Sequence, residues 1–325
     1  MHHRKLRRLL TVAGLAAGFA ALAPALAASP ADYPHKPITL IVPYSPGGTT
    51  DMAARALAEN LSRQFQQPVL IENKPGAGGS MGVTEMTKAA PDGYRLTLAP
   101  VGIFRQPHLQ PVRYDPIRDL AYIAAFMEYD FFVAVPADSP FKTMKDMVDF
   151  AKQNPGAVSY GTPGRFSGNH VVLAMLGTKY GAKFAHVPFK GDSDSTNSLL
   201  GGHLKTAVIA NSIMPFMQAG KVRVLASAGD VVNPVFKAPT LRELGYDVFV
   251  PSPLGLAGPK GLPKPIVEKL DKAVKLALED PHFKKLLDAN GLRATYMDNE
   301  AYTQFAKKAF ADEEKVVKNL GMETD

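Results

Sequence analysis

The feature that most limits the possible folds of this chain is an apolar run followed by a glycine turn and then directly by an amphipathic run. Residues 38–42 (ITLIV) predict a buried strand, Pro46-Gly47-Gly48 predicts a turn, and residues 52–65 predict a helix. Glycines let the backbone approach a ligand closely, and the first N–H groups of a helix favour an anion. A plain strand-to-helix turn fits the same residues. The candidate binding residues here are Tyr44, Ser45, Gly47, Gly48 and Asp51.

Strand and helix patterns alternate along most of the remaining chain, which predicts an α/β fold. In the first part, strands at 38–42, 69–71 and 95–99 enclose helices at 52–65 and 80–90, and this order implies a parallel sheet covered on both faces. A second series of strands and helices begins near residue 131. We therefore predict two α/β lobes, with residues 28–126 and 250–325 in the first and 127–249 in the second. Segments 131–136 and 250–258 are predicted to cross between them, which allows hinge closure on a ligand in the cleft.

The N-terminal segment has the pattern of a cleaved secretory signal. Basic residues at positions 4, 5, 7 and 8 precede an uncharged run from 9 to 22, and small residues end at Ala27. We expect residues 1–27 to be removed and the mature protein to be exported, which in a bacterium means the periplasm. The net charge of +7 then falls to about +3. No basic tract interleaved with aromatic residues remains, so nucleic-acid binding has little support.

A second glycine-rich loop, Lys74 to Gly82, also leads into a predicted helix. Its spacing is similar to a dinucleotide fingerprint, but that motif requires the loop after the first strand and an acid at the end of the second. Neither condition is met, so we expect no cofactor. The favoured interpretation is a second set of backbone donors facing the first loop.

Residues 161–170 (GTPGRFSGNH) bring three polar side chains to the start of another predicted helix. The guanidinium of Arg165 can bind a carboxylate through two hydrogen bonds. Ser167 is either a ligand contact or the helix N-cap, and His170 either contacts ligand or hydrogen-bonds within its own lobe. Arg165 pairing with a surface acid remains the alternative for that residue.

Residues 190–194 (KGDSD) end a further strand and precede another helix. Acids in a first helical turn usually interact with the helix dipole. If Asp192 instead points into the cleft, it repels a bare anion or binds an ammonium or hydroxyl group of the ligand.

Patterns typical of enzymes are sparse. The chain has no cysteine, its eight histidines are scattered without metal-ligand spacing, and no Gly-x-Ser-x-Gly elbow occurs. We expect no catalytic residues and no metal. An exported hydrolase or isomerase using His170 with Asp192 is the remote alternative.

The segments VPYSPGGTTDMAARAL, ENKPGAGGSMG, APDGYRL, YDPIRDL and HVPFKG…LLGGHLK, in this order, resemble the tripartite tricarboxylate transporter receptor family, also called Bug proteins. The resemblance implies a type II periplasmic binding protein that closes on a small organic acid and holds its carboxylate by main-chain amides and ordered waters. It implies first-lobe contacts at 44–51 and 75–80, which include Ala77 and Gly78. Second-lobe contacts are implied at 162–170 and 190–194, which include Thr162.

Three positions depart from the family pattern: Arg165, Asp194 and Lys205. We expect Arg165 to bind a distal anionic group, which favours an aliphatic or aromatic dicarboxylate over an amino acid or a nicotinate-like ligand. The predicted function is a monomeric receptor that delivers a di- or tricarboxylate to a membrane permease. A ligand carrier for a periplasmic sensor has the same cleft and differs only in its partner.

Overall fold

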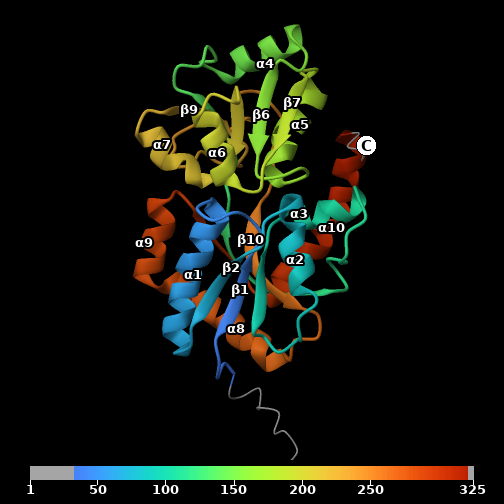
Figure 1. The fold of residues 1–325 in the computed structure, drawn as a ribbon, viewed down its shortest axis with the longest axis vertical. Coiled ribbons are helices and arrows are strands. Elements are labelled where there is room, and N and C mark those ends of the chain that lie inside the picture. The colour runs from blue at the N-terminus through green and yellow to red at the C-terminus, as the bar shows by residue number, and fades with distance from the viewer. Residues whose placement is uncertain (1–32, 321–325) are drawn as a thin grey trace, which may run out of the picture. The chain divides into compact units, whose positions relative to one another are not determined.

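The computed structural model describes residues 33–320, so the predicted signal segment lies outside the described residues. Two sheets organise the chain (Figure 1). The first has six strands in the order β11-β4-β10-β3-β1-β2, and the second has five in the order β7-β6-β8-β5-β9. The first-sheet strands are β1 (Ile38–Val42), β2 (Val69–Asn73), β3 (Arg95–Ala99), β4 (Leu120–Glu128), β10 (Pro253–Pro259) and β11 (Arg293–Met297). The second-sheet strands are β5 (Phe132–Pro136), β6 (Val158–Thr162), β7 (Phe184–Pro188), β8 (Thr206–Ile209) and β9 (Val222–Ser227).

Both sheets are mixed rather than wholly parallel. In the first, β1 pairs in parallel with β2 and β3, whereas β10 is antiparallel to β3 and β4. In the second, β6 pairs in parallel with β7 and β8, and β5 is antiparallel to β8 and β9. The parallel core was predicted correctly. The antiparallel strands β4, β10 and β11 were not predicted.

Helices follow most of the parallel strands, as the sequence pattern predicts. The helices of the first-sheet half are α1 (Thr49–Phe65), α2 (Ser80–Met86), α3 (Gly102–Arg105), α8 (Lys264–Glu279), α9 (Pro281–Ala289) and α10 (Asn299–Leu320). Those of the second-sheet half are α4 (Met144–Gln153), α5 (Gly168–Tyr180), α6 (Asp192–Leu200) and α7 (Met214–Gln218). Helix α1 packs on α8 and α9, while α10 packs on α3 and β4. Helices therefore flank the first sheet on both sides (Figure 1).

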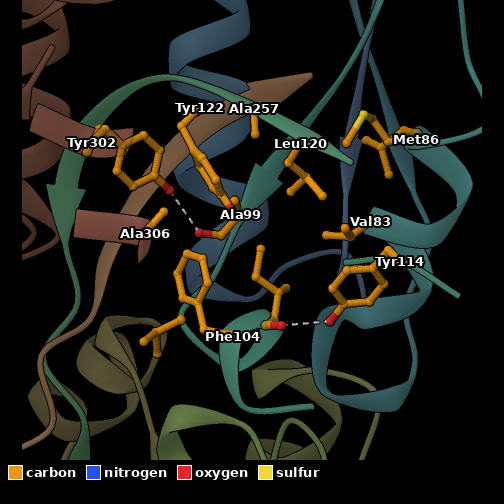
Figure 2. Packing of buried hydrophobic residues seen from close by; sticks show 14 residues of the cluster. Val83, Met86, Ala99, Phe104, Tyr114, Leu120, Tyr122, Ala257, Tyr302 and Ala306 are labelled. Atoms are coloured by element: carbon orange, nitrogen blue, oxygen red, sulfur yellow. Dashed lines mark hydrogen bonds between the residues drawn. The ribbon is translucent and has the colours of Figure 1, made fainter. Parts of the chain in front are cut away.

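A buried cluster joins α2, α3 and α10 to the first sheet (Figure 2). The hydroxyl of Tyr302 on α10 donates a hydrogen bond to the carbonyl of Ala99 on β3 at 3.2 Å, and Tyr122 packs edge-on against the Tyr302 ring. Phe104 of α3 contacts Tyr122 from the other side. Burial of such a ring contributes roughly 2–3 kcal/mol. The C-terminal helix is thus fixed to the strands whose ends face the second sheet.

The chain passes twice between the sheets, at residues 129–131 and again between β9 and β10. One arginine of β11 connects these passages: Arg293 pairs with Glu128 at 3.3 Å, with Asp130 at 3.4 Å and with Asp230 at 2.7 Å. The segment predicted as the first crossing is largely strand β5, and β4 continues in the first sheet to Glu128. From Pro34 onward the chain forms one compact unit, so the lobe boundaries stay a prediction. No helix within residues 33–320 is long and apolar enough to cross a membrane.

Candidate ligand-binding site

A small enclosed cavity lies where loops of the first sheet meet loops of the second. Its volume is about 20 Å³, which accommodates about one ordered water molecule. The first residues of α1, α5 and α6 all contribute to its wall. The lining residues are Tyr44, Gly48, Thr49, Thr50, Pro100, Val101, Gly102, Tyr129, Phe131, Pro163, Gly168, Asn169, Asp192 and Ala210.

Convergence of three helix N-termini makes this cavity favourable for negative charge. The first turn of a helix has N–H groups without intrahelical acceptors, and its dipole is positive at that end. Gly48 is the N-cap of α1 and has no side chain to satisfy these donors. A methyl group at Gly48 would lie 3.3 Å from Cβ of Asp192, so glycine is what allows the second-sheet half to approach this helix end. The predicted anion loop is therefore placed in the cavity wall.

Asp51, in contrast, is engaged in structural contacts. It accepts hydrogen bonds from the amide of Gly47 at 2.9 Å, from Arg55 at 2.9 and 3.1 Å, and from Nδ2 of Asn73 at 2.9 Å. Burial opposes ionisation, but the hydrogen bonds from Arg55, Gly47 and Asn73 together hold the pKa of Asp51 below its usual value. Asp51 is outside the cavity lining. It fixes the glycine turn, and its predicted contact with a ligand stays a prediction.

The second glycine loop contacts the other half of the protein instead of the cavity. Gly78 has φ +59, and a methyl group there would lie 2.6 Å from the carbonyl oxygen of Arg165. The neighbouring Ala77 accepts a hydrogen bond from Nε2 of Gln106 at 3.0 Å. The hydroxyl of Tyr44 donates to the carbonyl of Gly78 at 3.2 Å, so the two loops do meet. Neither Ala77 nor Gly78 lines the cavity.

Ser167 has the local role offered as the alternative to ligand binding, and Thr162 also makes local contacts. Ser167 is the N-cap of α5, and its hydroxyl accepts from the amide of His170 at 3.3 Å. The hydroxyl of Thr162 donates to the carbonyl of Gly164 at 3.1 Å and is hydrogen-bonded to Nε2 of His186 at 2.7 Å. Both residues shape the loop that brings Pro163 and Gly168 to the cavity.

Arg165 and His170 line a different, open groove of about 660 Å³ on the second-sheet half. The Arg165 guanidinium is exposed and lies over the Phe166 ring. His170 accepts from the amide of Phe166 at 3.1 Å and stacks on His186 at 3.9 Å. Burial, together with the neighbouring His186, keeps the pKa of His170 far below its usual value. Arg165 therefore lies outside the cavity lining, and its role in binding a distal anionic group stays a prediction.

Asp192 is the acid that reaches the cavity. It is 6% exposed, and its Oδ2 accepts from the hydroxyl of Thr49 at 3.0 Å and from that of Ser212 at 3.4 Å. Its Oδ1 is buried and has no hydrogen-bond partner within residues 33–320. Burial raises the pKa of Asp192 to about 6, although the hydroxyl of Thr49, the amides of Ala210 and Thr49 and the hydroxyl of Ser212 favour the charged form.

Polar contacts near the cavity hold the two halves together. Ser45 donates through its hydroxyl to Asp194 at 2.8 Å and through its amide to the carbonyl of Lys190 at 3.2 Å. The amide of Ser212 donates to the hydroxyl of Thr49 at 2.8 Å. Ser45 and Gly47, which were predicted to bind ligand, thus lie at the boundary between the halves. These contacts are short and formed by small side chains, so they can separate without unfolding either sheet.

Arg105 makes the most buried of these contacts. Its Nη1 donates to the carbonyls of Phe166 at 2.9 Å and Ser167 at 3.2 Å, while its Nε donates to Glu313 at 2.7 Å. Arg105 is only 1% exposed. No sequence pattern singled it out, because its partners are distant in the chain.

Several lining residues were also missed from the sequence. Tyr129 is hydrogen-bonded through its hydroxyl to that of Thr50 at 2.7 Å, and Asn169 donates to the carbonyl of Val208 at 3.0 Å. Tyr129 immediately follows β4, so recognising that strand would have identified it. Within residues 33–320, no group of three His, Asp or Glu side chains is placed to hold a metal ion.

Comparison with known proteins decides the family. The model of the tripartite tricarboxylate transporter family receptor matches residues 53–322. The chain belongs to this family. A curated relative, the "UPF0065 protein in gbd 5'region" of Cupriavidus necator, is 39% identical over 322 residues, which cover 97% of this chain and 98% of the relative.

Solved structures of this receptor family share the fold. The periplasmic binding protein BugD superposes with a TM-score of 0.86 at 29% identity, covering 90% of this chain and all of BugD. Rpa4515 of Rhodopseudomonas palustris with adipate superposes with a TM-score of 0.84 at 26% identity, covering 89% of this chain and 98% of Rpa4515. MatC of the same species with bound malate superposes with a TM-score of 0.81 at 27% identity, covering 88% of this chain and all of MatC. The predicted α/β periplasmic-binding-protein fold is confirmed.

Proposed function

We propose that this receptor-family protein captures a small organic acid in the periplasm for uptake by a membrane permease. The observation that carries the proposal is the convergence of the N-termini of α1, α5 and α6 on one enclosed cavity between the sheets. Backbone amides and helix dipoles at such a point stabilise a carboxylate without a basic side chain. Relatives crystallised with adipate and with malate support an acid as the ligand.

Capture requires the two halves to separate and close again. A cavity of about 20 Å³ is far smaller than any organic acid. Two chain passages joined through Arg293 are where bending can occur, since sheet interiors are close-packed. Closure then brings Ser45, Thr49 and Arg105 back toward the second-sheet half, with the acid held between the two halves. A monomer suits this motion.

Delivery to a permease follows from the family and distinguishes this proposal from its alternatives. A sensor partner would use the same closed form, and no feature of the described residues favours it. For a hydrolase, His170 and Asp192 would have to act together, yet they belong to different cavities. We therefore propose reversible binding without turnover.

Thermal-shift screening of the protein from residue 28 onward, followed by calorimetry, tests the proposal. The panel holds mono-, di- and tricarboxylates, aromatic acids and amino acids. A ligand at a hundredfold excess over its Kd stabilises the folded state by about 2.7 kcal/mol. A saturable shift with recovery of unchanged ligand supports capture. No shift from any acid, or conversion of a bound acid to product, contradicts it.

A further inference from the structure

We propose that Asp192 selects acids that carry an ammonium group, so that the ligand is an amino acid bound as a zwitterion rather than an unsubstituted dicarboxylate. The inference rests on the proposed function and concerns the same cavity. It is carried by one buried carboxylate oxygen, Oδ1 of Asp192, which has no hydrogen-bond partner among the described residues and belongs to a side chain that lines the cavity.

Asp192 is fixed in position by its other oxygen. Oδ2 is held by the hydroxyls of Thr49 and Ser212, which belong to opposite halves of the protein. The side chain therefore cannot turn to solvent without losing both contacts. A buried polar atom left without a partner costs about 1–3 kcal/mol, and more when it is charged. A ligand that donates a hydrogen bond to Oδ1 removes this cost.

The charges around Asp192 distinguish between possible donors. Tyr44 and Tyr129 face it from the first-sheet half; burial first, and then nearby charges that include Asp192, raise their pKa values, so both phenols stay neutral. Asp194, on the same helix, is turned toward Ser45. Arg105 is committed to Glu313 and to two carbonyls. Among the described residues that line the cavity, none is a lysine, arginine or histidine.

A hydroxyl donor would satisfy Oδ1 but leave the buried charge uncompensated. An ammonium group supplies both the hydrogen bond and the opposite charge, and buried charges are tolerated when they are paired. A second carboxylate at the same place would repel Asp192 in a medium of low polarity. The preferred order at this position is therefore ammonium, then hydroxyl, then an unsubstituted carbon.

The carboxylate of the same ligand has a separate place to bind. Gly168 and Asn169 begin α5, and with Gly102 they form the wall contributed by the first turns of α5 and α3. A methyl group at Gly168 would overlap the Phe131 ring at 2.6 Å, so the Phe131 ring packs directly against the start of α5.

Matched ligands test the inference by calorimetry. Aspartate, malate and succinate differ only in bearing an amino group, a hydroxyl or hydrogen at one carbon. Two further series repeat the comparison at other lengths: alanine, lactate and propionate form one, and glutamate, 2-hydroxyglutarate and glutarate form the other. At pH 7.5 we expect the amino member of the best-fitting series to bind at least tenfold tighter than the unsubstituted member. Asp192→Asn should reduce this ratio to less than threefold.

Asp194→Asn is the matched control because it lies in the same helix but outside the cavity lining. It should change the three affinities of a series by a common factor and keep their ratio. With the wild-type protein, affinity for the amino ligand should fall as the pH drops below about 6, when Asp192 becomes protonated.

Three outcomes overturn the inference: equal binding within each series, tighter binding of the hydroxy acid, and succinate or glutarate binding that strengthens at low pH. The last would mean that Asp192 shares a proton with a ligand carboxylate. Failure of all nine acids to bind, while another acid of the screening panel binds, overturns the inference alone, whereas failure of the whole panel contradicts the proposed function. Amino-acid preference that survives Asp192→Asn also overturns the role of Asp192.

Discussion

Arg105 and Glu313 form a buried ion pair that joins α3 to the C-terminal helix, with Nε of the arginine 2.7 Å from Oε2 of the glutamate. The same guanidinium donates to two carbonyls of the second-sheet half. The position of α10 is therefore transmitted directly to the boundary between the halves. Neither partner reaches solvent easily, so the pair stabilises the fold mainly by preventing an isolated buried charge.

Removing Glu313 should destabilise the protein strongly. Glu313→Ala leaves the Arg105 guanidinium buried with half its partners, and we expect the free energy of unfolding to fall by about 3 kcal/mol. Denaturant titration measures it. Glu314→Ala is the control, since Glu314 is exposed and its hydrogen bond among the described residues is to Lys318, and should change stability by less than about 0.5 kcal/mol. Equal effects of the two substitutions would contradict a structural role for the pair.

Asp192→Asn should stabilise the folded protein at neutral pH. The pKa of Asp192 is raised to about 6 from 3.8, so the folded state binds this proton more tightly than the unfolded chain does. In the wild type, its contribution to stability therefore improves as pH falls from about 7 to about 4. Asparagine removes the cost of the buried charge, a gain of up to about 3 kcal/mol at pH 7.5. The difference should vanish near pH 4, and a gain independent of pH would exclude this explanation.

Asp51→Asn should destabilise the folded protein, in contrast to Asp192→Asn. The pKa of Asp51 is below its usual value, so its contribution is present above about pH 4 and is lost only in stronger acid. The asparagine turns an NH2 group toward Arg55 or Gly47, and we expect a loss of about 2 kcal/mol that stays constant between pH 5 and 8. Thermal unfolding at several pH values measures it. Asp149→Asn, which breaks an exposed pair with Lys145, should have little effect.

Gly78→Ala should impair closure more than folding. The residue has φ +59, and the added methyl group would meet the carbonyl of Arg165 at 2.6 Å across the boundary between the halves. Gly202→Ala is the control: it has a similar backbone cost, about 1 kcal/mol, but its added methyl group would have no atom within 4 Å. We expect both variants to lose similar stability, but only Gly78→Ala to weaken ligand binding, by tenfold or more. Equal affinities by calorimetry would show that close approach here is not needed.

Arg165→Ala should leave affinity within twofold of the wild type. The side chain is exposed and lines the open groove, not the enclosed cavity. Calorimetry with the best ligand found by the screen measures this. A loss of tenfold or more would restore the role expected from sequence, in which Arg165 binds a distal anion.

Local patterns predicted the α/β fold and the loops that matter, because strand and helix periodicity and glycine turns are properties of neighbouring residues. The antiparallel position of β10 between β3 and β4 depends on pairing across more than a hundred residues, which no local pattern encodes. The same lack of information about distant contacts explains which site residues the sequence placed correctly in the cavity wall and which it did not. Gly48 and Asp192 follow strands, and both line the cavity as the strand-end rule predicts. The directions of Asp51 and Arg165 are decided by Arg55, Asn73 and Phe166 in the folded protein.

The order of strands in the first sheet also constrains how the molecule is assembled. Strand β10 lies in the middle of that sheet, yet it is synthesised after all the strands of the second sheet. When the chain emerges with its N-terminus first, β5 to β9 can therefore pair while β3 and β4 still lack the strand that joins them. The second-sheet half has a complete sheet first, and the first half closes around its late strand, so premature termination before residue 253 would leave two open strand edges exposed to aggregation.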